Sequence, residues 1–213
     1  MSNLAANYDA NAAIRQKPLR RQLGEIYDAI NPDGTEKRRL GSLVPTAALL
    51  SPAVGADGTV YIGSGSGAGS GGFFAIAPDG TQKWSTGTQQ FQISAAIGGD
   101  GTVYTGTYNH LGDGQFFAFN PNGSTKWSFI APPRPGIPPA NGFLSSPAVA
   151  GDDSIYASCE NGFLYALNPD GSKKWSFAEA SPDSSCTSGS ASPAIGADGT
   201  IYLGVCNNFY AIH

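Results

Sequence analysis

Charged side chains are scarce in this chain of 213 residues: Asp, Glu, Lys and Arg together make up 13%, and the formal net charge is −4. Binding to a nucleic-acid backbone requires clustered Lys and Arg, so we expect no nucleic-acid partner. The sequence also lacks any apolar run near the roughly 20 residues of a membrane helix, so we expect no membrane span. Residues 1–8 have neither the basic nor the apolar stretch of a signal peptide, which leaves the compartment open.

Histidine and cysteine, which supply many catalytic and metal sites, are also few. His110 and His213 are the only histidines, and neither stands in a pattern typical of a Ser-His-Asp triad or a metal site. The three cysteines are an odd number, so at least one thiol is unpaired within the chain or paired outside it. The sequence therefore predicts no catalytic residue, no metal ligand and no cofactor site.

Glycine and proline are by contrast abundant, with 29 and 15 residues, and most of them recur in an internal repeat. One signature is Pro-Asp/Asn-Gly followed by polar residues, Lys and Trp. It begins at Pro78, Pro121 and Pro169, and a degenerate copy begins at Pro32, where Arg38 replaces the tryptophan. The second signature, typified by Ser-Pro-Ala-Val, an Asp-Gly turn and Thr-Val-Tyr, occupies residues 51–61, 94–104, 146–156 and 192–202.

Each repeat predicts four strands, which we call A to D in chain order. Turn signals separate short segments of alternating polarity, a pattern typical of antiparallel sheets. Units of this length with four strands predict an all-β chain, a β-propeller of about four four-stranded antiparallel blades. The expected blades occupy about residues 47–86, 90–129, 143–178 and 188–213, the last completed by residues 24–43.

The last blade contains only strands A, B and C in residues 188–213, while a strand D is present near the N-terminus at residues 35–40. We therefore expect the N-terminal strand to close the last blade. Residues 26–30 then form a surplus strand C, which lies outside the ring or pairs with another subunit. Residues 1–23 have no repeat character and are expected to form an N-terminal arm or short helix ahead of the propeller at 24–213.

The two signatures together resemble the PQQ-like, quinoprotein-type β-propeller repeat, and the resemblance covers about residues 24–213. It implies that Trp84, Trp127 and Trp175 dock neighbouring blades. It also points to the non-catalytic scaffold branch of the family, which includes an outer-membrane assembly lipoprotein, and favours an extracytoplasmic location. The quinoprotein enzymes have a vicinal cysteine pair, whereas the cysteines of this chain are never adjacent.

We therefore expect a non-catalytic binding or scaffold module with no cofactor and a protein or glycan partner. The alternative is a fragment of a quinone-dependent oxidoreductase, or a half-ring that forms a homodimer with eight blades. The uniform A–B and C–D turns should lie on one rim, while the longer and more varied B–C and D–A loops should form the binding face. Candidate residues on that face are Tyr108, Asn109, His110, Asp113, Arg134, Glu160, Asn161 and Asp183. A disulfide among Cys159, Cys186 and Cys206 is also possible there.

Overall fold

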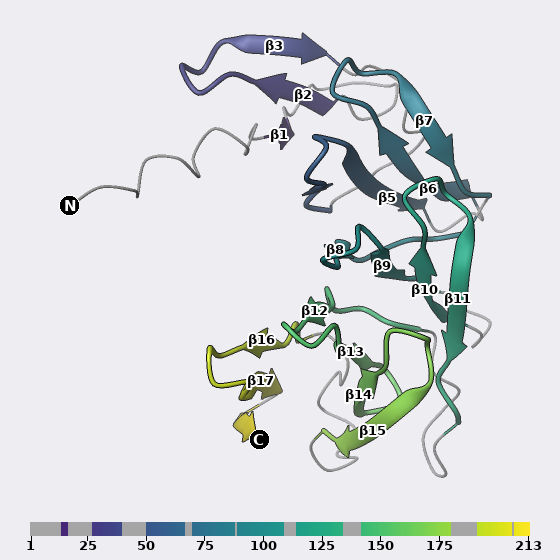
Figure 1. The fold of residues 1–213 in the computed structure, drawn as a ribbon, viewed down its shortest axis with the longest axis vertical. Helices are drawn as coiled ribbons and strands as arrows, with labels where there is room; N and C mark the ends of the chain where they lie inside the picture. The colour runs from purple at the N-terminus through teal and green to yellow at the C-terminus, as the bar shows by residue number, and fades with distance from the viewer. Residues whose placement is uncertain are drawn as a thin grey trace.

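The computed structural model describes residues 14–16, 27–39, 50–66, 70–87, 89–108, 114–133, 142–179, 191–205 and 207–213. Every regular element within these ranges is a β-strand, and no helix there is long and apolar enough to cross a membrane. The strands form five antiparallel sheets that follow one another along an open arc (Figure 1).

Four of the sheets correspond to the predicted repeats, and we call them blades 1 to 4. Strands β8, β12 and β16 lie on the inner side of the arc, and β11 and β15 lie on its outer side (Figure 1). Blade 1 contains β4 (Ala53–Val54), β5 (Val60–Ser66), β6 (Ser70–Ile76) and β7 (Gln82–Ser85). Blade 2 contains β8 (Ala96–Ile97), β9 (Val103–Gly106), β10 (Gln115–Phe119) and β11 (Thr125–Ile130). Blade 3 contains β12 (Ala148–Val149), β13 (Ile155–Cys159), β14 (Phe163–Leu167) and β15 (Lys173–Ala178). Blade 4 contains β16 (Ala194–Ile195), β17 (Ile201–Val205) and β18 (Asn208–Ile212).

The strands of each blade pair in chain order, so the predicted all-β propeller fold is confirmed, although the arc does not close into a ring. The Asp-Gly turns between strands A and B place their glycines at positive φ, as at Gly58 (77°), Gly101 (81°) and Gly199 (84°). Blade 3 has Asp153 at the same place with φ 61°, a conformation that non-glycine residues rarely adopt.

Apolar side chains from neighbouring blades pack together to form the core. Phe73 of blade 1 lies in one cluster with Val103 and Phe119 of blade 2. Phe116 of blade 2 lies in the next cluster with Ile155 and Tyr165 of blade 3, and a third cluster joins blades 3 and 4. A single blade therefore cannot bury its faces alone, and each depends on its neighbours.

The strand-D tryptophans reach across to the following blade. The indole Nε1 of Trp84 donates a hydrogen bond of 2.9 Å to the carbonyl oxygen of Pro121 in blade 2. Trp127 makes the same contact, at 2.8 Å, with Pro169 in blade 3. Each ring lies over the glycine of the turn that it contacts, because a Cβ built on Gly123 would be 2.7 Å from Trp84 Cδ2 and one on Gly171 would be 2.6 Å from Trp127 Cδ2.

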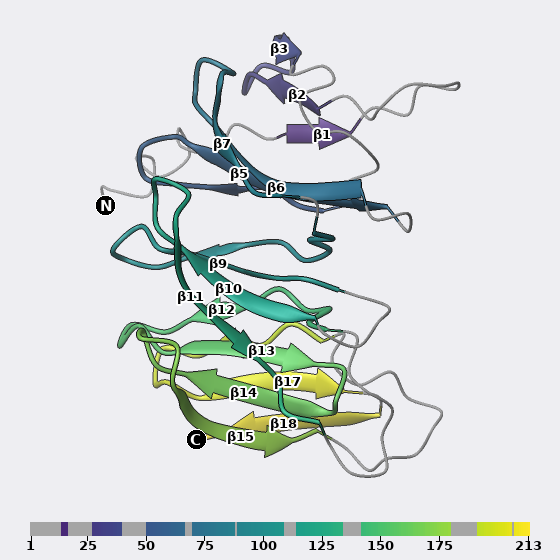
Figure 2. The same ribbon diagram turned by 90° about the vertical axis from the view of Figure 1, so that its right-hand side faces the viewer.

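The N-terminal strands differ from the prediction. Strands β1 (Ile14–Gln16), β2 (Tyr27–Ile30) and β3 (Glu36–Arg39) form a separate sheet in the order β1-β2-β3. The prediction that the N-terminal strand closes the last blade is therefore wrong for this structure, in which the N-terminal sheet and blade 4 lie at opposite ends of the arc (Figure 2). The reason is local: the turn at Asn31–Thr35 folds β3 directly back onto β2.

Residues 14–16 also form a strand rather than part of a short helix, because they pair with β2. The rest of the predicted N-terminal arm, residues 1–13 and 17–23, lies outside the described residues, so the division of the chain at residue 24 stays a prediction.

The tryptophan contacts predict that alanine substitutions at two glycines of similar backbone conformation will cost different amounts of stability. Gly171 and Gly199 have φ of 87° and 84°, but a Cβ on Gly199 would meet nothing within 4 Å. Both Gly→Ala substitutions should cost about 1 kcal/mol for the left-handed backbone. Gly171→Ala should lose about 1–3 kcal/mol more, because the methyl group displaces the Trp127 ring. Urea unfolding of the two variants measures the difference, and equal losses would contradict the packing role.

Candidate functional site

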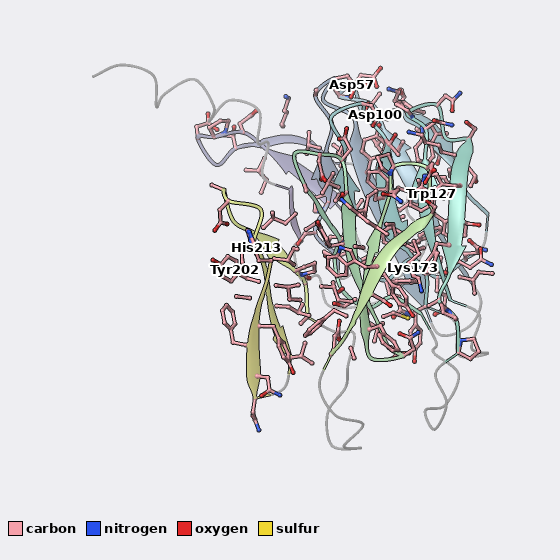
Figure 3. All side chains as sticks on the ribbon, turned by 60° about the horizontal axis from the view of Figure 1, so that its bottom comes forward. Asp57, Asp100, Trp127, Lys173, Tyr202 and His213 are labelled. Atoms are coloured by element: carbon pink, nitrogen blue, oxygen red, sulfur yellow. The ribbon has the colours of Figure 1, made fainter. Side chains whose placement is uncertain are left out.

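The two ends of the blades differ in chemistry. We call the end with the A–B and C–D turns the turn rim, and the end with the B–C and D–A connections the loop face. Asp57 and Asp100 gather at one edge of the molecule in Figure 3, on the turn rim.

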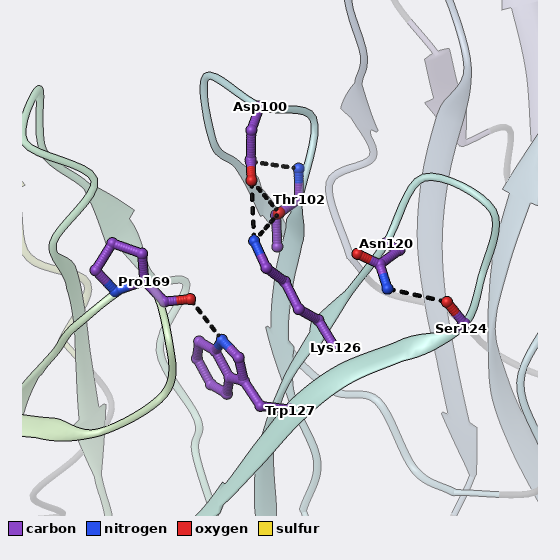
Figure 4. Close-up of polar contacts among 7 residues, drawn as sticks. All are labelled: Asp100, Thr102, Asn120, Ser124, Lys126, Trp127 and Pro169. Atoms are coloured by element: carbon purple, nitrogen blue, oxygen red, sulfur yellow. Dashed lines mark hydrogen bonds and ion pairs between the residues drawn. The ribbon is translucent and has the colours of Figure 1, made fainter.

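Carboxylates on the turn rim are held within their own blade (Figure 4). Asp100 Oδ1 accepts a hydrogen bond of 2.9 Å from the backbone N–H of Thr102, and its Oδ2 lies 3.0 Å from Lys126 Nζ. Lys126 also contacts Thr102 Oγ1 at 3.1 Å. The arrangement, which we call the clamp, joins the A–B turn to strand D. It recurs as Asp57–Thr59–Lys83 in blade 1 and Asp152–Ser154–Lys174 in blade 3.

The clamp lowers the pKa of these carboxyl groups. The pKa of Asp100 falls from 3.8 to about 2, mainly because the backbone N–H of Thr102 and then Lys126 stabilise the charged form. The pKa values of Asp57 and Asp152 are also lowered, with the backbone hydrogen bonds from Thr59 and Ser154 as the largest causes. Asp57, Asp100 and Asp198 are therefore turn-forming residues, as their Asp-Gly context indicates.

Two predicted candidates on the loop face contact the same backbone residue, Gly142, at the junction of blades 2 and 3. Tyr108 pairs with Gly142 in an isolated β-bridge, and the backbone N–H of Glu160 donates a 3.1 Å hydrogen bond to the Gly142 carbonyl oxygen. Gly142 has φ 143°, and a Cβ there would collide with the carbonyl oxygen of Thr107. Glycine at this position is thus what permits the backbone to pass close to Tyr108 while it accepts the hydrogen bond from Glu160.

Asn161, the third described candidate, is buried rather than exposed for binding. Only 1% of its surface is accessible, and its Nδ2 donates to the carbonyl oxygen of Pro132 at 2.9 Å and to the Tyr165 hydroxyl at 2.6 Å. Because Pro132 follows strand D of blade 2, the amide ties the loop face of blade 2 to the B–C turn of blade 3. Asn161 is therefore a positioning residue of the loop face.

Cys159 is a free thiol that is completely buried in the core between blades 2 and 3. Burial raises the pKa of this thiol to about 12, so it stays protonated at neutral pH. Its Sγ lies 3.4 Å from the Gly142 carbonyl oxygen, which it contacts as a weak donor. Cys186 and Cys206 lie outside the described residues, so a disulfide between these two stays a prediction.

The remaining candidates, Asn109, His110, Asp113, Arg134 and Asp183, also lie outside the described residues. Among the residues that are described, no group of three His, Cys, Asp or Glu side chains could hold a metal ion.

The sequence interpretation missed two phenylalanines that fix the loop face. Phe91 and Phe143 are fully buried, and each stands three residues before the serine of a Ser-(Ala/Pro)-Ala signature. A Cβ on Gly63 would lie 2.8 Å from Phe91 Cβ, and one on Gly106 would lie 2.7 Å from Phe143 Cβ. These rings therefore wedge between adjacent blades, and their equal spacing from the serine is the signal that could have identified them.

The loop face also exposes apolar side chains on the outer strand of blade 2. Ile130, the last residue of β11, is 58% exposed, and Pro132 and Pro133, which follow it, are exposed as well. The hydrogen bond from Asn161 to Pro132 holds this segment against blade 3. We call Ile130, Pro132 and Pro133 the apolar tip.

The family model for the outer membrane protein assembly factor BamB matches residues 24–203 of the sequence, which is most of the chain. The chain belongs to this PQQ-like propeller family. The predicted resemblance is thus confirmed by a match over the same repeats that form blades 1 to 4. Among curated proteins, none matches the sequence significantly.

Solved structures show the same fold at low sequence identity. BamB from Moraxella catarrhalis has a TM-score of 0.60 and 17% identity, over 90% of this chain and 57% of that one. The extracellular domain of a one-component system from B. thetaiotaomicron has a TM-score of 0.59 and 19% identity, over 89% of this chain and 24% of that one. A Bacteroides caccae protein of unknown function has a TM-score of 0.57 and 14% identity, over 88% of this chain and 65% of that one. The chain therefore spans less than two thirds of the length of each of these relatives.

The clamp predicts a defined pH dependence. Because the pKa of Asp100 is about 2 when folded and 3.8 otherwise, its stabilising effect is present above pH 3.8 and is lost as the pH falls through 2. Asp100→Asn should lower the free energy of unfolding at neutral pH by less than about 1 kcal/mol, since the pair is solvent-exposed. The difference from wild type should shrink between about pH 4 and pH 2. Urea unfolding across this range measures it, and a constant difference would contradict the clamp.

Proposed function

We propose that this protein is a non-catalytic binding and scaffold module that holds a protein partner on its loop face. Membership of the BamB family carries the proposal, because the family model is named for a factor in outer membrane protein assembly. The arc of blades would serve as a scaffold, and the side chains and loops that it positions would carry the function.

The contrast between the two rims supports the loop face as the binding surface. On the turn rim, the clamps pair one aspartate of each A–B turn in blades 1 to 3 with the lysine of strand D. The loop face instead presents the apolar tip together with Tyr108 and Glu160. Interfaces between proteins are centred on apolar and aromatic side chains of this kind.

A protein partner fits these residues better than a glycan does. The apolar tip consists of an isoleucine and two prolines, whose burial against another apolar surface would be favourable. The prediction of a homodimer stays a prediction and is separate from this proposal.

Site-specific photo-crosslinking in the producing cells tests the proposal. Benzoylphenylalanine at Ile130 or Tyr108 should give an adduct with one protein, whereas the same residue at Asn122 or Asp170 on the turn rim should not. With the captured partner purified, Ile130→Asp should weaken binding about tenfold or more, because it places a charge in the interface. Its unfolding midpoint should stay near that of wild type, since Ile130 is 58% exposed.

Asn122→Asp, which adds the same charge on the turn rim, is the matched control and should leave binding unchanged. Equal adducts from both rims, or no protein adduct from the loop face, would refute the proposal.

A further inference from the structure

Asparagine side chains that are followed by glycine deamidate more readily than others, because glycine has no side chain to hinder its backbone nitrogen. The chain contains this pair three times, at residues 122–123, 141–142 and 161–162. Asn141 lies outside the described residues. The surroundings of Asn122 and Asn161 differ, and they determine which of these two side chains reacts.

Asn161 is protected from this reaction by burial and by hydrogen bonds. Deamidation requires that the glycine nitrogen attacks the side-chain carbonyl carbon, that the amide nitrogen leaves as ammonia, and that water hydrolyses the product. Asn161 is only 1% exposed, and its Nδ2, the leaving nitrogen, donates to the Pro132 carbonyl oxygen at 2.9 Å and to the Tyr165 hydroxyl at 2.6 Å. The N–H of Gly162 donates to the Cys159 carbonyl oxygen at 2.9 Å. We therefore expect Asn161 to stay intact in the folded chain.

Asn122 is instead exposed, on the C–D turn of blade 2 between β10 and β11. Its Oδ1 accepts hydrogen bonds from the backbone N–H of Ser124 at 3.0 Å and from the Ser124 hydroxyl at 2.7 Å. That hydroxyl also accepts from Asn120 Nδ2 at 2.9 Å (Figure 4). Both contacts on Oδ1 withdraw electron density from the side-chain carbonyl carbon and so favour attack there. Among the described residues none holds the Asn122 Nδ2, which leaves ammonia free to depart into solvent.

The attacking nitrogen, that of Gly123, is held by its own turn and covered by blade 1. Its N–H donates a 2.9 Å hydrogen bond to the Asn120 carbonyl oxygen, which closes the turn. A Cβ on Gly123 would lie 2.7 Å from both Cγ and Cδ2 of Trp84, whose Nε1 donates to the Pro121 carbonyl oxygen at 2.9 Å. The turn must therefore open, against the contact with Trp84, before this nitrogen can attack.

We propose that Asn122 is a deamidation site, and that the contact of Trp84 with the C–D turn of blade 2 controls its rate. In the opened turn, the Gly123 nitrogen bonds to Asn122 Cγ and loses its proton to water. The bond from Cγ to Nδ2 breaks, and ammonia leaves a cyclic succinimide. Water then adds to one of the two ring carbonyl carbons and breaks its bond to nitrogen, which gives aspartate or isoaspartate at position 122. Water is the only co-reactant.

The two products have different consequences for the junction of blades 1 and 2. Aspartate fits the turn, because Asp79 and Asp170 stand at the same place in blades 1 and 3 and accept the same backbone hydrogen bond, each at 2.9 Å. Isoaspartate carries the main chain through the side-chain carbon and so lengthens the turn by one methylene group. That extra group displaces Gly123 from beneath the indole of Trp84, where the packing leaves no space.

Incubation of the intact chain at mildly alkaline pH, followed by peptide mass spectrometry, tests the site. Asn122 should deamidate while Asn161 does not, and about tenfold or more slowly than in a synthetic peptide of residues 119–126, because the turn is mostly closed. Trp84→Ala should raise the rate at Asn122 about fivefold or more, since a hydrogen bond and an aromatic contact are lost. Trp84→Phe, which keeps an aromatic ring but loses the hydrogen bond, should give an intermediate rate, and it decides the question alone if Trp84→Ala does not fold.

Trp127→Ala and Trp127→Phe are the matched controls, because they remove the same contact at the next junction, with Pro169. They should change the rate at Asn122 by less than about twofold, since distant sites act independently. Hydrogen exchange is the second readout: the amides of residues 120–124 should exchange faster in chains with isoaspartate at position 122, but not in Asn122→Asp. The proposal is overturned if Asn122 reacts as fast in the native chain as in the peptide, if Asn161 reacts first, or if the Trp84 and Trp127 variants accelerate the reaction equally.

Discussion

The contact between a tryptophan and the glycine of the next blade is the constraint on which this propeller depends. Trp127 donates to the Pro169 carbonyl oxygen and covers Gly171, so one residue joins the two sheets through both a hydrogen bond and a packing contact. Glycine is required at this position for two reasons: its φ is positive, and a Cβ would occupy the space of the indole ring. Because each C–D turn of blades 2 and 3 is held by the tryptophan of the blade before it, the stability of each blade depends on its contacts with its neighbours.

The clamps and the phenylalanine wedges complete this construction at opposite ends of the blades. On the turn rim, Lys126 ties strand D to the A–B turn through Asp100. On the loop face, Phe143 fills the space above Gly106 between blades 2 and 3. The clamps pair the charged groups of three A–B turns, and the wedges support a surface that carries the apolar tip. This division explains how one repeat can be uniform in its framework and still present an individual binding face.

Much of the fold could be predicted from the sequence, because the turns and hairpins of the repeat depend on only a few neighbouring residues. Pro-Asp-Gly and Asp-Gly turns fix hairpins over a few residues, and their recurrence sets the blade boundaries. The pairing of the N-terminal strand could not be predicted in this way. Strand β3 carries the strand-D pattern, but the turn at Asn31–Thr35 pairs it with β2 instead of with blade 4. The burial of Asn161 could not be predicted either, since it depends on Pro132 in another blade. Of the loop-face candidates, Tyr108 and Glu160 both contact the backbone of Gly142, an arrangement that no spacing in the sequence indicates.

A double-mutant cycle between Trp127 and Gly171 tests the central claim most directly. In the wild-type background, Gly171→Ala should cost both backbone strain and displacement of the indole ring. In a Trp127→Ala background the ring is absent, so the loss of unfolding free energy caused by Gly171→Ala should fall to that of Gly199→Ala, about 1 kcal/mol. If the losses from Trp127→Ala and Gly171→Ala simply add, the two residues do not act as one contact, and the account of how the blades are held together is contradicted.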